Sequence, residues 1–369
     1  MKRIVLLSLA LVMAAGMVFA TGQGEGGVGA IDVGIAMPET HVERWQRDGA
    51  DLLQLATDAG YRAEVTYGDA DQALQNQQIQ DFITKGARLL IVGNINEGVN
   101  SVISEAAEEG ITVIAYDRLI TGSDDYDYYI TFDNFRVGEF QGQAIVDALD
   151  LENASDSDPK YITLFAGSPT DNNAYFFFNG AMSRLRPYIE DGVLEVVGPA
   201  PMEASDSAFT RIATENWRPE VAKARMENLL SNAALDVTLD AVLAPNDTLA
   251  RAIIEALSAD DKYDTVEDLP VVTGQDGELA SIRMIRDGQQ HMTVFKDTRD
   301  LAEGAIELAD ALLQGEDAPS IEGARLDTET YDTGLKVVDS YLLSPVRVTQ
   351  ENWQEVMVEG GYYSEEDFE

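Results

Sequence analysis

From residue 31 onward, short apolar runs alternate with longer segments whose apolar residues recur at helical spacing. The apolar runs at 31–37 and 89–92 have the length of β-strands, and the segment 42–59 has the spacing of an amphipathic helix. Strands that alternate with helices imply right-handed crossovers and a parallel sheet. The same alternation restarts at residue 137, so the pattern predicts an α/β protein with two lobes.

The chain is long enough for each lobe to have its own core. Its 369 residues are enough for two domains, and 45% of them are hydrophobic. No long linker rich in proline or serine separates the two halves. Two similar halves joined by short extended segments predict a hinged pair with a cleft between them, an arrangement that suits closure around a ligand.

The charge and the residue types exclude several classes of function. The chain has 66 acidic and 25 basic residues, a net charge of −41, so its surface repels phosphate and nucleic acid is not an expected partner. There is no cysteine, which excludes disulfides and thiolate sites, and two histidines cannot by themselves form a three-histidine zinc site. We therefore predict no metal and no cofactor.

Residues 1–20 are typical of a secretory signal peptide. Lys2 and Arg3 precede an apolar stretch that ends in small residues, which predicts cleavage near Ala20 and export of a soluble protein. A retained membrane anchor is the alternative, although the stretch is short for a membrane span. Residues 21–30 are rich in glycine and predict a flexible leader.

Polar residues follow the predicted strands in both halves of the chain. These residues are Arg44, Asp117 and Arg118 in the first half, and Asp171, Asn173, Asn246, Asp276 and Lys296 in the second. The carboxyl ends of parallel strands share one rim, where small ligands bind. Carboxylates, amides and cations together supply donors and acceptors, which suits the hydroxyls of a polyol. Trp45 and Trp217 lie near the same rim, and their flat rings suit the apolar face of a sugar.

Other interpretations of these residues stay open at this point. An acidic or amide residue after a strand is commonly a helix cap, which applies to Asp171, and Trp45 could belong to the core. Asp171 and Asp276 could in principle be the acid and base of a glycosidase, although amides or cations accompany each of them. The chain has no G-x-S-x-G or H-E-x-x-H motif, and we predict no catalytic residue.

Six segments resemble periplasmic monosaccharide-binding proteins of ABC importers, in the group that binds xylose or several monosaccharides. The segments are GIAMPETHVERWQRDG, VIAYDRLI, YITFDNFRVGEFQ, GSPTDNNAYFFFNGAMSRLRPYI, VVTGQDGELASI and MTVFKDTRDLA. The likeness extends from about residue 31 to residue 365. It implies the type I periplasmic binding protein fold, in which two Rossmann-like, doubly wound lobes with parallel sheets are joined by a three-segment hinge.

The resemblance also implies the division of the chain and the roles of the site residues. The N-terminal lobe would comprise residues 31–134 and 297–333, and the C-terminal lobe residues 135–296 and 334–369. Arg44, Asp117 and Arg118 would hold a pyranose from the first lobe. The residues implied for the second lobe are Asp171, Asn173, Asn246, Asp276 and Lys296, with Trp217 packed on the sugar ring and Trp45 beside Arg44.

The function implied by the resemblance is that of a solute-binding component of an ABC sugar transporter. Such a protein is a monomer in the periplasm that closes on a monosaccharide and delivers it to the permease subunits. The sugar would be of the xylose, glucose, galactose or arabinose type. The alternative is that the sugar-loaded protein is a ligand for a chemoreceptor or a sensor kinase. A transcription regulator of the same fold would need a basic helix-turn-helix where this chain has its predicted signal peptide.

Overall fold

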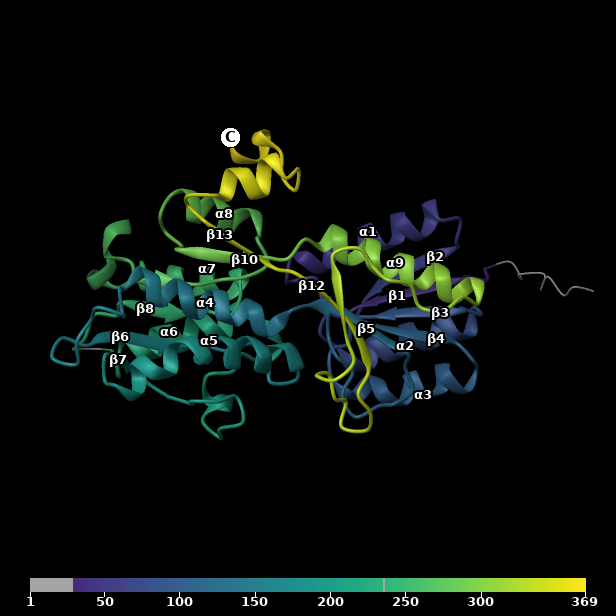
Figure 1. Cartoon of the computed structure of the whole chain (residues 1–369), viewed down its shortest axis with the longest axis horizontal. Coiled ribbons are helices and arrows are strands. Elements are labelled where there is room, and N and C mark those ends of the chain that lie inside the picture. Colours follow the sequence, from purple (N-terminus) through teal and green to yellow (C-terminus); the bar gives the residue numbers. More distant parts are fainter. Residues whose placement is uncertain (1–28, 235) are drawn as a thin grey trace, which may run out of the picture.

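The structure is a computed structural model that describes residues 29–234 and 236–369. The predicted signal peptide, residues 1–20, lies outside the described residues, and so does the predicted leader apart from its last two residues. Two α/β lobes lie side by side along the long axis of the molecule (Figure 1). No helix in the described part of the chain is long and apolar enough to cross a membrane.

A sheet that has seven strands within the described residues forms the centre of the first lobe. In order across the sheet, the strands are β11 (Ala324–Asp327), β12 (Asp339–Leu343), β5 (Tyr128–Phe132), β4 (Thr112–Tyr116), β3 (Leu89–Val92), β1 (Val33–Met37) and β2 (Ala63–Tyr67). Neighbouring strands are parallel except for β11 and β12. The helices of this lobe are α1 (Arg44–Asp58), α2 (Gln72–Thr84), α3 (Asn100–Glu108) and α9 (Thr298–Gln314).

Helices cover both faces of this sheet because its strands are apolar on both sides. Ile35 of β1 shares a hydrophobic cluster with Leu52 of α1 and Leu301 of α9. Leu90 of β3 lies in another cluster, together with Phe82 of α2 and residues of α3. Burial on both faces is typical of a doubly wound parallel sheet. The predicted α/β fold class is therefore confirmed.

The second lobe contains a parallel sheet and a separate antiparallel ribbon. The sheet consists, in order, of β7 (Leu194–Val196), β6 (Lys160–Leu164), β8 (Ala241–Leu243) and β9 (Val271–Val272). In the ribbon, β10 (Met292–Phe295) pairs with β13 (Val346–Thr349). The helices are α4 (Asn134–Ala148), α5 (Asn172–Glu190), α6 (Pro219–Leu230), α7 (Asp247–Leu257) and α8 (Leu279–Arg286).

Within the described residues the chain crosses between the lobes three times. The crossings join β5 to α4, β10 to α9 and β12 to β13. The third crossing lies later than the sequence predicted, because β12 pairs in parallel with β5 of the first lobe. The division implied by the resemblance places all of residues 334–369 in the second lobe, whereas β12 lies in the first. The alternating apolar residues of this stretch predict extended chain, but strand pairing over such a distance depends on tertiary contacts.

Glycines allow α4 and α5 to pack with their backbones in contact. A Cβ atom at Gly138 would lie 2.0 Å from the carbonyl oxygen of Phe177, and one at Gly180 would lie 2.1 Å from the carbonyl oxygen of Phe135. No side chain fits at either point. This close packing fixes the start of α5, which lies at the cleft between the lobes.

Candidate functional site

All ten residues that the sequence singled out line one cavity between the two lobes. They are Arg44, Trp45, Asp117, Arg118, Asp171, Asn173, Trp217, Asn246, Asp276 and Lys296. The cavity has an empty volume of about 300 Å³, including space that is open to solvent, and Val42, Phe177 and Gln275 complete its lining. The structure thus brings these residues together, while their contact with a ligand stays a prediction.

Arg44, the first residue of α1, lies between two carboxylates. Its Nη1 donates to Oδ1 of Asp117 at 2.7 Å, and its Nε and Nη2 donate to Oδ2 of Asp48 at 3.0 and 2.6 Å. Burial opposes the charge of Arg44, but Asp117 and Asp48 outweigh it and raise the pKa of Arg44. Two acids therefore share one cation at this wall of the cavity.

The two acids beside Arg44 differ in their pKa values. Burial raises the pKa of Asp48 to about 7, although Arg44 opposes this shift. Burial also acts to raise the pKa of Asp117, but Arg44, and after it Lys296, outweigh burial and lower it. Asp117 is therefore the ionised acid that faces the cavity, and Asp48 is the acid behind it that takes up a proton more readily.

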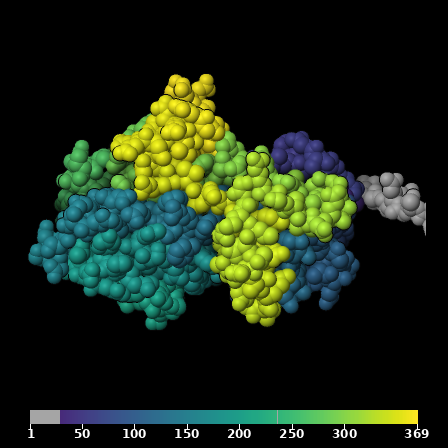
Figure 2. Space-filling view, in the orientation of Figure 1, coloured from purple at the N-terminus to yellow at the C-terminus, as the bar shows by residue number. Residues whose placement is uncertain are grey.

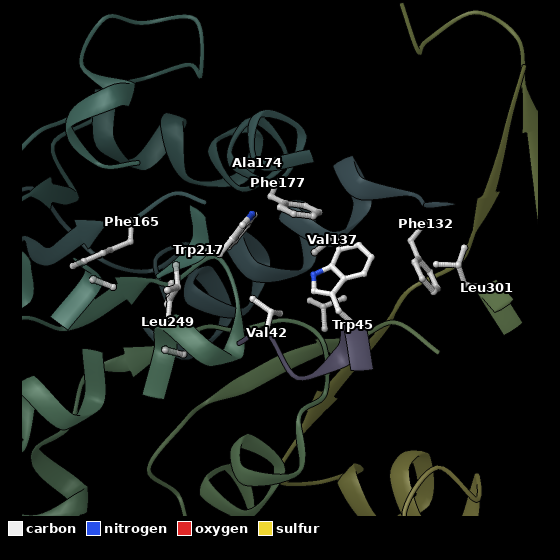
Figure 3. Packing of buried hydrophobic residues seen from close by; sticks show 14 of the residues in the cluster. Val42, Trp45, Phe132, Val137, Phe165, Ala174, Phe177, Trp217, Leu249 and Leu301 are labelled. Carbon is white, nitrogen blue, oxygen red and sulfur yellow. The ribbon is translucent and has the colours of Figure 1, made fainter. Parts of the chain in front are cut away.

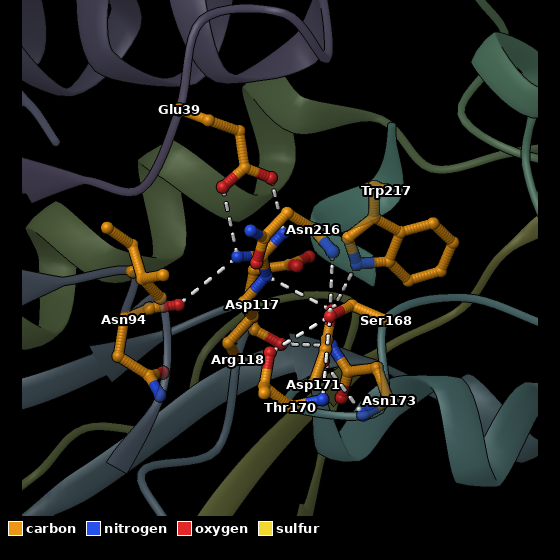
Figure 4. A network of polar contacts seen from close by, with 12 residues as sticks. Glu39, Asn94, Asp117, Arg118, Ser168, Thr170, Asp171, Asn173, Asn216 and Trp217 are labelled. Atoms are coloured by element: carbon orange, nitrogen blue, oxygen red, sulfur yellow. Dashed lines mark hydrogen bonds and ion pairs between the residues drawn. The ribbon is translucent and has the colours of Figure 1, made fainter. Parts of the chain in front are cut away.

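Arg118 is held from behind and presents one N–H to the cavity. Its Nη1 and Nη2 donate to the two carboxylate oxygens of Glu39 at 3.2 and 2.6 Å, and Nη1 also donates to the carbonyl oxygen of Asn94 (Figure 4). This two-pronged contact fixes the plane of the guanidinium group. Nε lies 3.1 Å from Oδ2 of Asp171, an ion pair across the cleft, but has no acceptor with hydrogen-bond geometry among the described residues.

Asp171 caps helix α5 and also faces the cavity. Its Oδ1 accepts from the N–H of Asn173 at 2.9 Å, which makes Asp171 the N-cap of the helix. Its Oδ2 accepts from Nε1 of Trp217 at 3.1 Å (Figure 4). Burial raises the pKa of Asp171, although Arg118 opposes this shift. Asp171 is therefore a helix cap through Oδ1 and a residue of the cavity lining, while its contact with a ligand stays a prediction.

The side chain of Asn173 joins the two lobes. Its amide oxygen accepts from Nδ2 of Asn134 at 2.9 Å and lies 3.0 Å from the hydroxyl oxygen of Tyr129. Its Nδ2 donates to the carbonyl oxygen of Asp117 at 2.6 Å. Tyr129 and Asp117 belong to the first lobe, so these contacts cross the cleft. Most of the hydrogen-bonding capacity of Asn173 is used within the protein, which leaves one N–H for a ligand.

Asp276 and Lys296 line the cavity from the second lobe. Nζ of Lys296 lies 3.0 Å from Oδ1 of Asp276, and Nδ2 of Asn246 lies 3.5 Å from Oδ2. Nη1 of Arg44 comes within 4.0 Å of Oδ1 from the first lobe. In the part of the chain that the structure describes, Oδ1 of Asp276 has no donor with hydrogen-bond geometry. Asn246 also caps α7, because its Oδ1 accepts from the N–H of Leu249 at 3.0 Å.

Aromatic rings supply the apolar part of the lining. Trp45, Phe177 and Trp217 lie close together in the packed interior between the lobes (Figure 3). The guanidinium groups of Arg44 and Arg118 lie 4.8 and 5.0 Å from the ring centroid of Trp45. Phe177 and Trp217 meet edge to face at 6.4 Å. Trp45 is therefore both a core residue and a lining residue, so the two interpretations from the sequence are compatible.

The backbone is left-handed at three lining residues that are not glycine. The φ angles are 61° at Asp117, 53° at Trp217 and 97° at Asp276. Such residues cost of order 1–3 kcal/mol each and persist where the surrounding structure imposes them, commonly at binding sites. At Asp117 the hydroxyls of Tyr129 and Thr131 donate to the carbonyl oxygen at 2.7 and 3.0 Å, which holds the turn in place.

Two buried acids behind the cavity were not predicted from the sequence. Asp48 lies one helical turn after Arg44, a spacing at which ion pairs form on helices, so this pair could have been found. Glu39 is 79 residues from Arg118, and no local pattern connects them. Both acids orient the guanidinium groups without lining the cavity themselves.

The chemistry of the site suits the binding of a polar molecule. In residues 29–234 and 236–369, no group of three or more histidines, cysteines or acids could hold a metal ion. The lining contains three carboxylates and three cations, so its formal charges balance. A balanced lining favours a neutral ligand over an anion or a cation, and carboxylates alternating with cations offer both acceptors and donors to hydroxyl groups.

Comparisons with known sequences identify the family of this chain and several relatives. Residues 33–317 match the family model of the periplasmic binding protein domain. The chain is 45% identical over 332 residues to the multiple sugar-binding periplasmic receptor ChvE of Rhizobium radiobacter, which covers 90% of each chain. It is 36% identical over 336 residues to the D-xylose-binding periplasmic protein of Escherichia coli strain K12, which covers 91% of this chain and 92% of that protein.

Solved structures show the same likeness. An ABC transporter solute-binding protein from Clostridium phytofermentans with bound β-D-glucose matches with a TM-score of 0.83 at 40% identity, over 91% of this chain and 99% of that one. A carbohydrate transporter solute-binding protein from Chloroflexus aurantiacus in complex with D-glucose has a TM-score of 0.80 at 35% identity, over 91% and 98% of the two chains. The resemblance carried by the six segments is confirmed: this chain belongs to the family of periplasmic binding protein domains, and the relatives named above are sugar-binding periplasmic proteins and transporter solute-binding proteins.

Proposed function

We propose that this protein binds a monosaccharide in the cavity between its lobes. The observation that carries the proposal is a buried donor and a buried acceptor, Nε–H of Arg118 and Oδ1 of Asp276. Each lines the cavity from a different lobe and is ion-paired there, with Oδ2 of Asp171 at 3.1 Å and with Nζ of Lys296 at 3.0 Å, but makes no contact with hydrogen-bond geometry among the described residues. Buried polar groups rarely lack a well-aligned hydrogen bond. A hydroxyl both donates and accepts, so a ring that carries several hydroxyls satisfies both groups.

The apolar lining and the relatives support a sugar of the aldose class. The rings of Trp217 and Phe177 suit the C–H face of a pyranose. One relative is named as a multiple sugar-binding protein, another as a D-xylose-binding protein, and two similar structures hold glucose. We therefore expect a sugar of the xylose, glucose, galactose or arabinose type.

Binding is coupled to closure because the cavity has walls from both lobes. A sugar that contacts Arg118 and Asp276 together does so only when the lobes are closed, so it shifts the population toward the closed form. The hydrogen bond from Asn173 to the carbonyl of Asp117, at 2.6 Å, is part of the same closed arrangement. No step of this mechanism breaks a bond in the sugar. Nuclear magnetic resonance of the bound sugar over hours is expected to show no turnover.

Calorimetry with a panel of monosaccharides tests the site. We expect Asp276→Asn to weaken sugar binding by about 100-fold. The asparagine side chain carries no negative charge, and one of the two acceptor oxygens of the carboxylate becomes an NH₂ group. Asp191→Asn makes the same chemical change at an exposed position after α5 and is expected to bind as the wild type does. Absence of binding by the wild type, or equal affinities for wild type and Asp276→Asn, would overturn the proposal.

The sugar-loaded protein would deliver its ligand to the permease subunits of an ABC transporter. We place it in the periplasm as a monomer, after cleavage of the signal peptide near Ala20. Mass spectrometry of the exported protein tests the cleavage, and scattering tests the monomer. Stimulation of the transporter's ATPase by loaded wild type, but not by Asp276→Asn, is the expected result for delivery.

A second candidate function uses the same binding site. The relative from Rhizobium radiobacter is named a receptor, which supports a signalling role for the sugar-loaded form. In that role the closed protein would be the ligand of a chemoreceptor or a sensor kinase. Capture of a sensor domain by the sugar-loaded protein, and not by the sugar-free protein, is the expected result.

A further inference from the structure

The C-terminal segment, residues 353–369, packs on the second lobe. Met357 and Tyr363 belong to a hydrophobic cluster with Ile282 and Ile285 of α8. Arg283, also in α8, donates to the backbone carbonyl of Asp367. In Figure 2 the segment, in yellow, rises above the second lobe near its boundary with the first. It is therefore anchored to one lobe at a position close to the other.

Tyr362 connects this segment to the first lobe. Its hydroxyl lies 3.0 Å from Oγ1 of Thr298, at the start of α9. The guanidinium groups of Arg47 in α1 and Arg299 in α9 lie 4.2 and 5.1 Å from its ring centroid. Arg47 and Arg299 also donate to backbone carbonyls of the segment, at Tyr362 and at Gly361. These contacts link the segment to the lobe on which it is not anchored.

Tyr363, the next residue, contacts the turn that carries Asp276. Its hydroxyl donates to the carbonyl oxygen of Gly277 at 2.9 Å. Asp276 and Gly277 both have left-handed backbones, with φ angles of 97° and 67°. A turn of this kind needs such support from outside. The guanidinium of Arg47 also lies over the ring of Tyr363, at 5.1 Å, so the two neighbouring tyrosines share one cation from the first lobe.

A second cavity lies between the C-terminal segment and the proposed sugar site. It is lined by Glu43, Arg44, Gln46, Arg47, Asp276, Glu278, Tyr362 and Tyr363. Arg44 and Asp276 line both cavities. Arg44 and Asp276, which would hold the sugar, therefore lie between the tyrosine pair and the proposed sugar site.

We infer that the C-terminal segment is an interlobe latch, and that Tyr363 within it is a positioning residue for Asp276. The latch joins the first lobe through Arg47, and it supports the carboxylate of Asp276 through Gly277. Because α1 and the segment belong to different lobes, opening of the cleft separates Arg47 from the tyrosines. The latch therefore stabilises the closed form alone. Its effect on sugar binding rests on the proposed function, whereas its effect on closure does not.

The kinetics of sugar binding test the contact with Arg47. We expect Arg47→Ala to raise the dissociation rate by about 10-fold and to leave the association rate nearly unchanged, because the lost cation–π contacts exist only after closure. Arg186→Ala is the matched control, since Arg186 also donates to a backbone carbonyl, that of Met202, but within the second lobe. Equal dissociation rates for Arg47→Ala and Arg186→Ala would overturn the latch.

A double-mutant cycle tests the positioning role of Tyr363. Tyr363→Phe removes only the hydroxyl and is expected to weaken sugar binding by about 3- to 10-fold. If Tyr363 acts through Asp276, the same change has little further effect in an Asp276→Asn background. Independent effects, which multiply in the double variant, would show that Tyr363 does not act through Asp276.

Scattering from the sugar-free protein separates this inference from the proposed function. We expect Arg47→Ala to have a larger radius of gyration than the wild type and Arg186→Ala, because it populates the open form more. If the wild type binds no sugar of the panel, the proposed function fails, and scattering alone decides on the latch. Equal radii for all three proteins would overturn it.

Discussion

At the scale of single residues, Arg118 depends on an acid that does not line the cavity. Glu39 is 2% exposed, and both of its carboxylate oxygens accept from Arg118. We expect Arg118→Ala to remove most sugar binding. We also expect it to lower the free energy of unfolding by about 3–5 kcal/mol, because Glu39 is left as a buried charge without its partner. Urea denaturation followed by circular dichroism measures this loss.

The double variant Arg118→Ala/Glu39→Gln separates stability from binding. It removes both charges, so we expect it to regain most of the lost stability while sugar binding stays absent. If the single variant were as stable as the wild type, Glu39 would not be the cause. Recovery of sugar binding in the double variant would contradict the role of Arg118.

Asp48 makes the stability of the protein depend on pH. Its pKa is about 7 in the folded protein against an ordinary value of 3.8, because burial disfavours its charge. Between these values the folded state binds a proton that the unfolded state has released. The stability that this proton contributes is fully present below about pH 4 and is lost as the pH rises through about 7.

The variant Asp48→Asn isolates this contribution. Because it cannot titrate, we expect its free energy of unfolding to fall less than that of the wild type between about pH 4.5 and pH 7.5. Urea denaturation at several pH values measures both curves, and the difference between them removes the effect of all other groups. Curves that run parallel across this range would contradict the raised pKa of Asp48.

At the scale of elements, the first turn of α5 brings the second lobe to the cleft, and Asp171 caps it. Asp171→Ser keeps a side-chain oxygen for the N–H of Asn173, whereas Asp171→Ala does not. Both variants lose the carboxylate that faces Arg118. We expect the alanine variant to be less stable than the serine variant by about 1 kcal/mol, and both to bind sugar equally poorly.

Thermal unfolding and calorimetry of the two variants test this division of roles. Equal stabilities would mean that the cap is unimportant for α5. Sugar binding by Asp171→Ser at the wild-type affinity would mean that the oxygen facing Trp217 and Arg118 has no role in the site.

Much of the architecture and the site could be predicted because it depends on local patterns. The strands and helices follow the spacing of apolar residues over a few turns or a few residue pairs. The rule that the carboxyl ends of parallel strands share a rim places Arg118 on the rim of the first lobe, and Asp171 and Asp276 on the rim of the second. The meeting of the two rims depends in addition on how the lobes face each other. The predicted residues could therefore be named without knowing any distance between them.

The features that could not be predicted all depend on contacts between segments far apart in the sequence. β12 joins the first lobe because it pairs with β5, and Glu39 reaches Arg118 only through the fold. Tyr363 acts on a turn that precedes it by 86 residues. In none of these pairs does the spacing or the residue type indicate, from the sequence, that the two partners are in contact. For Asp171 the sequence could not decide between a helix cap and a cavity residue. One oxygen of its carboxylate accepts from the N–H of Asn173, and the other accepts from Trp217.

At the scale of the whole molecule, the charges form two populations. Those of the cavity are buried, and their signs balance. The acidic excess of the chain, with its net charge of −41, therefore lies outside the cavity. Salt screens exposed charges over about 10 Å at ionic strengths near 0.1 M and screens buried pairs much less. The two populations should consequently respond differently to salt.

We expect the melting temperature to rise by several degrees between about 0.05 M and about 0.5 M NaCl, because salt weakens the repulsion between surface acids. Over the same range we expect the dissociation constant for the sugar to change by less than about twofold, because the ligand is neutral and its contacts are buried. Thermal unfolding and calorimetry on one preparation measure both. A constant melting temperature would contradict the role of surface repulsion. A dissociation constant that rises tenfold with salt would mean that the charges of the cavity are open to solvent, and that the lobes close less completely than the contacts between Arg118, Asp171 and Asn173 require.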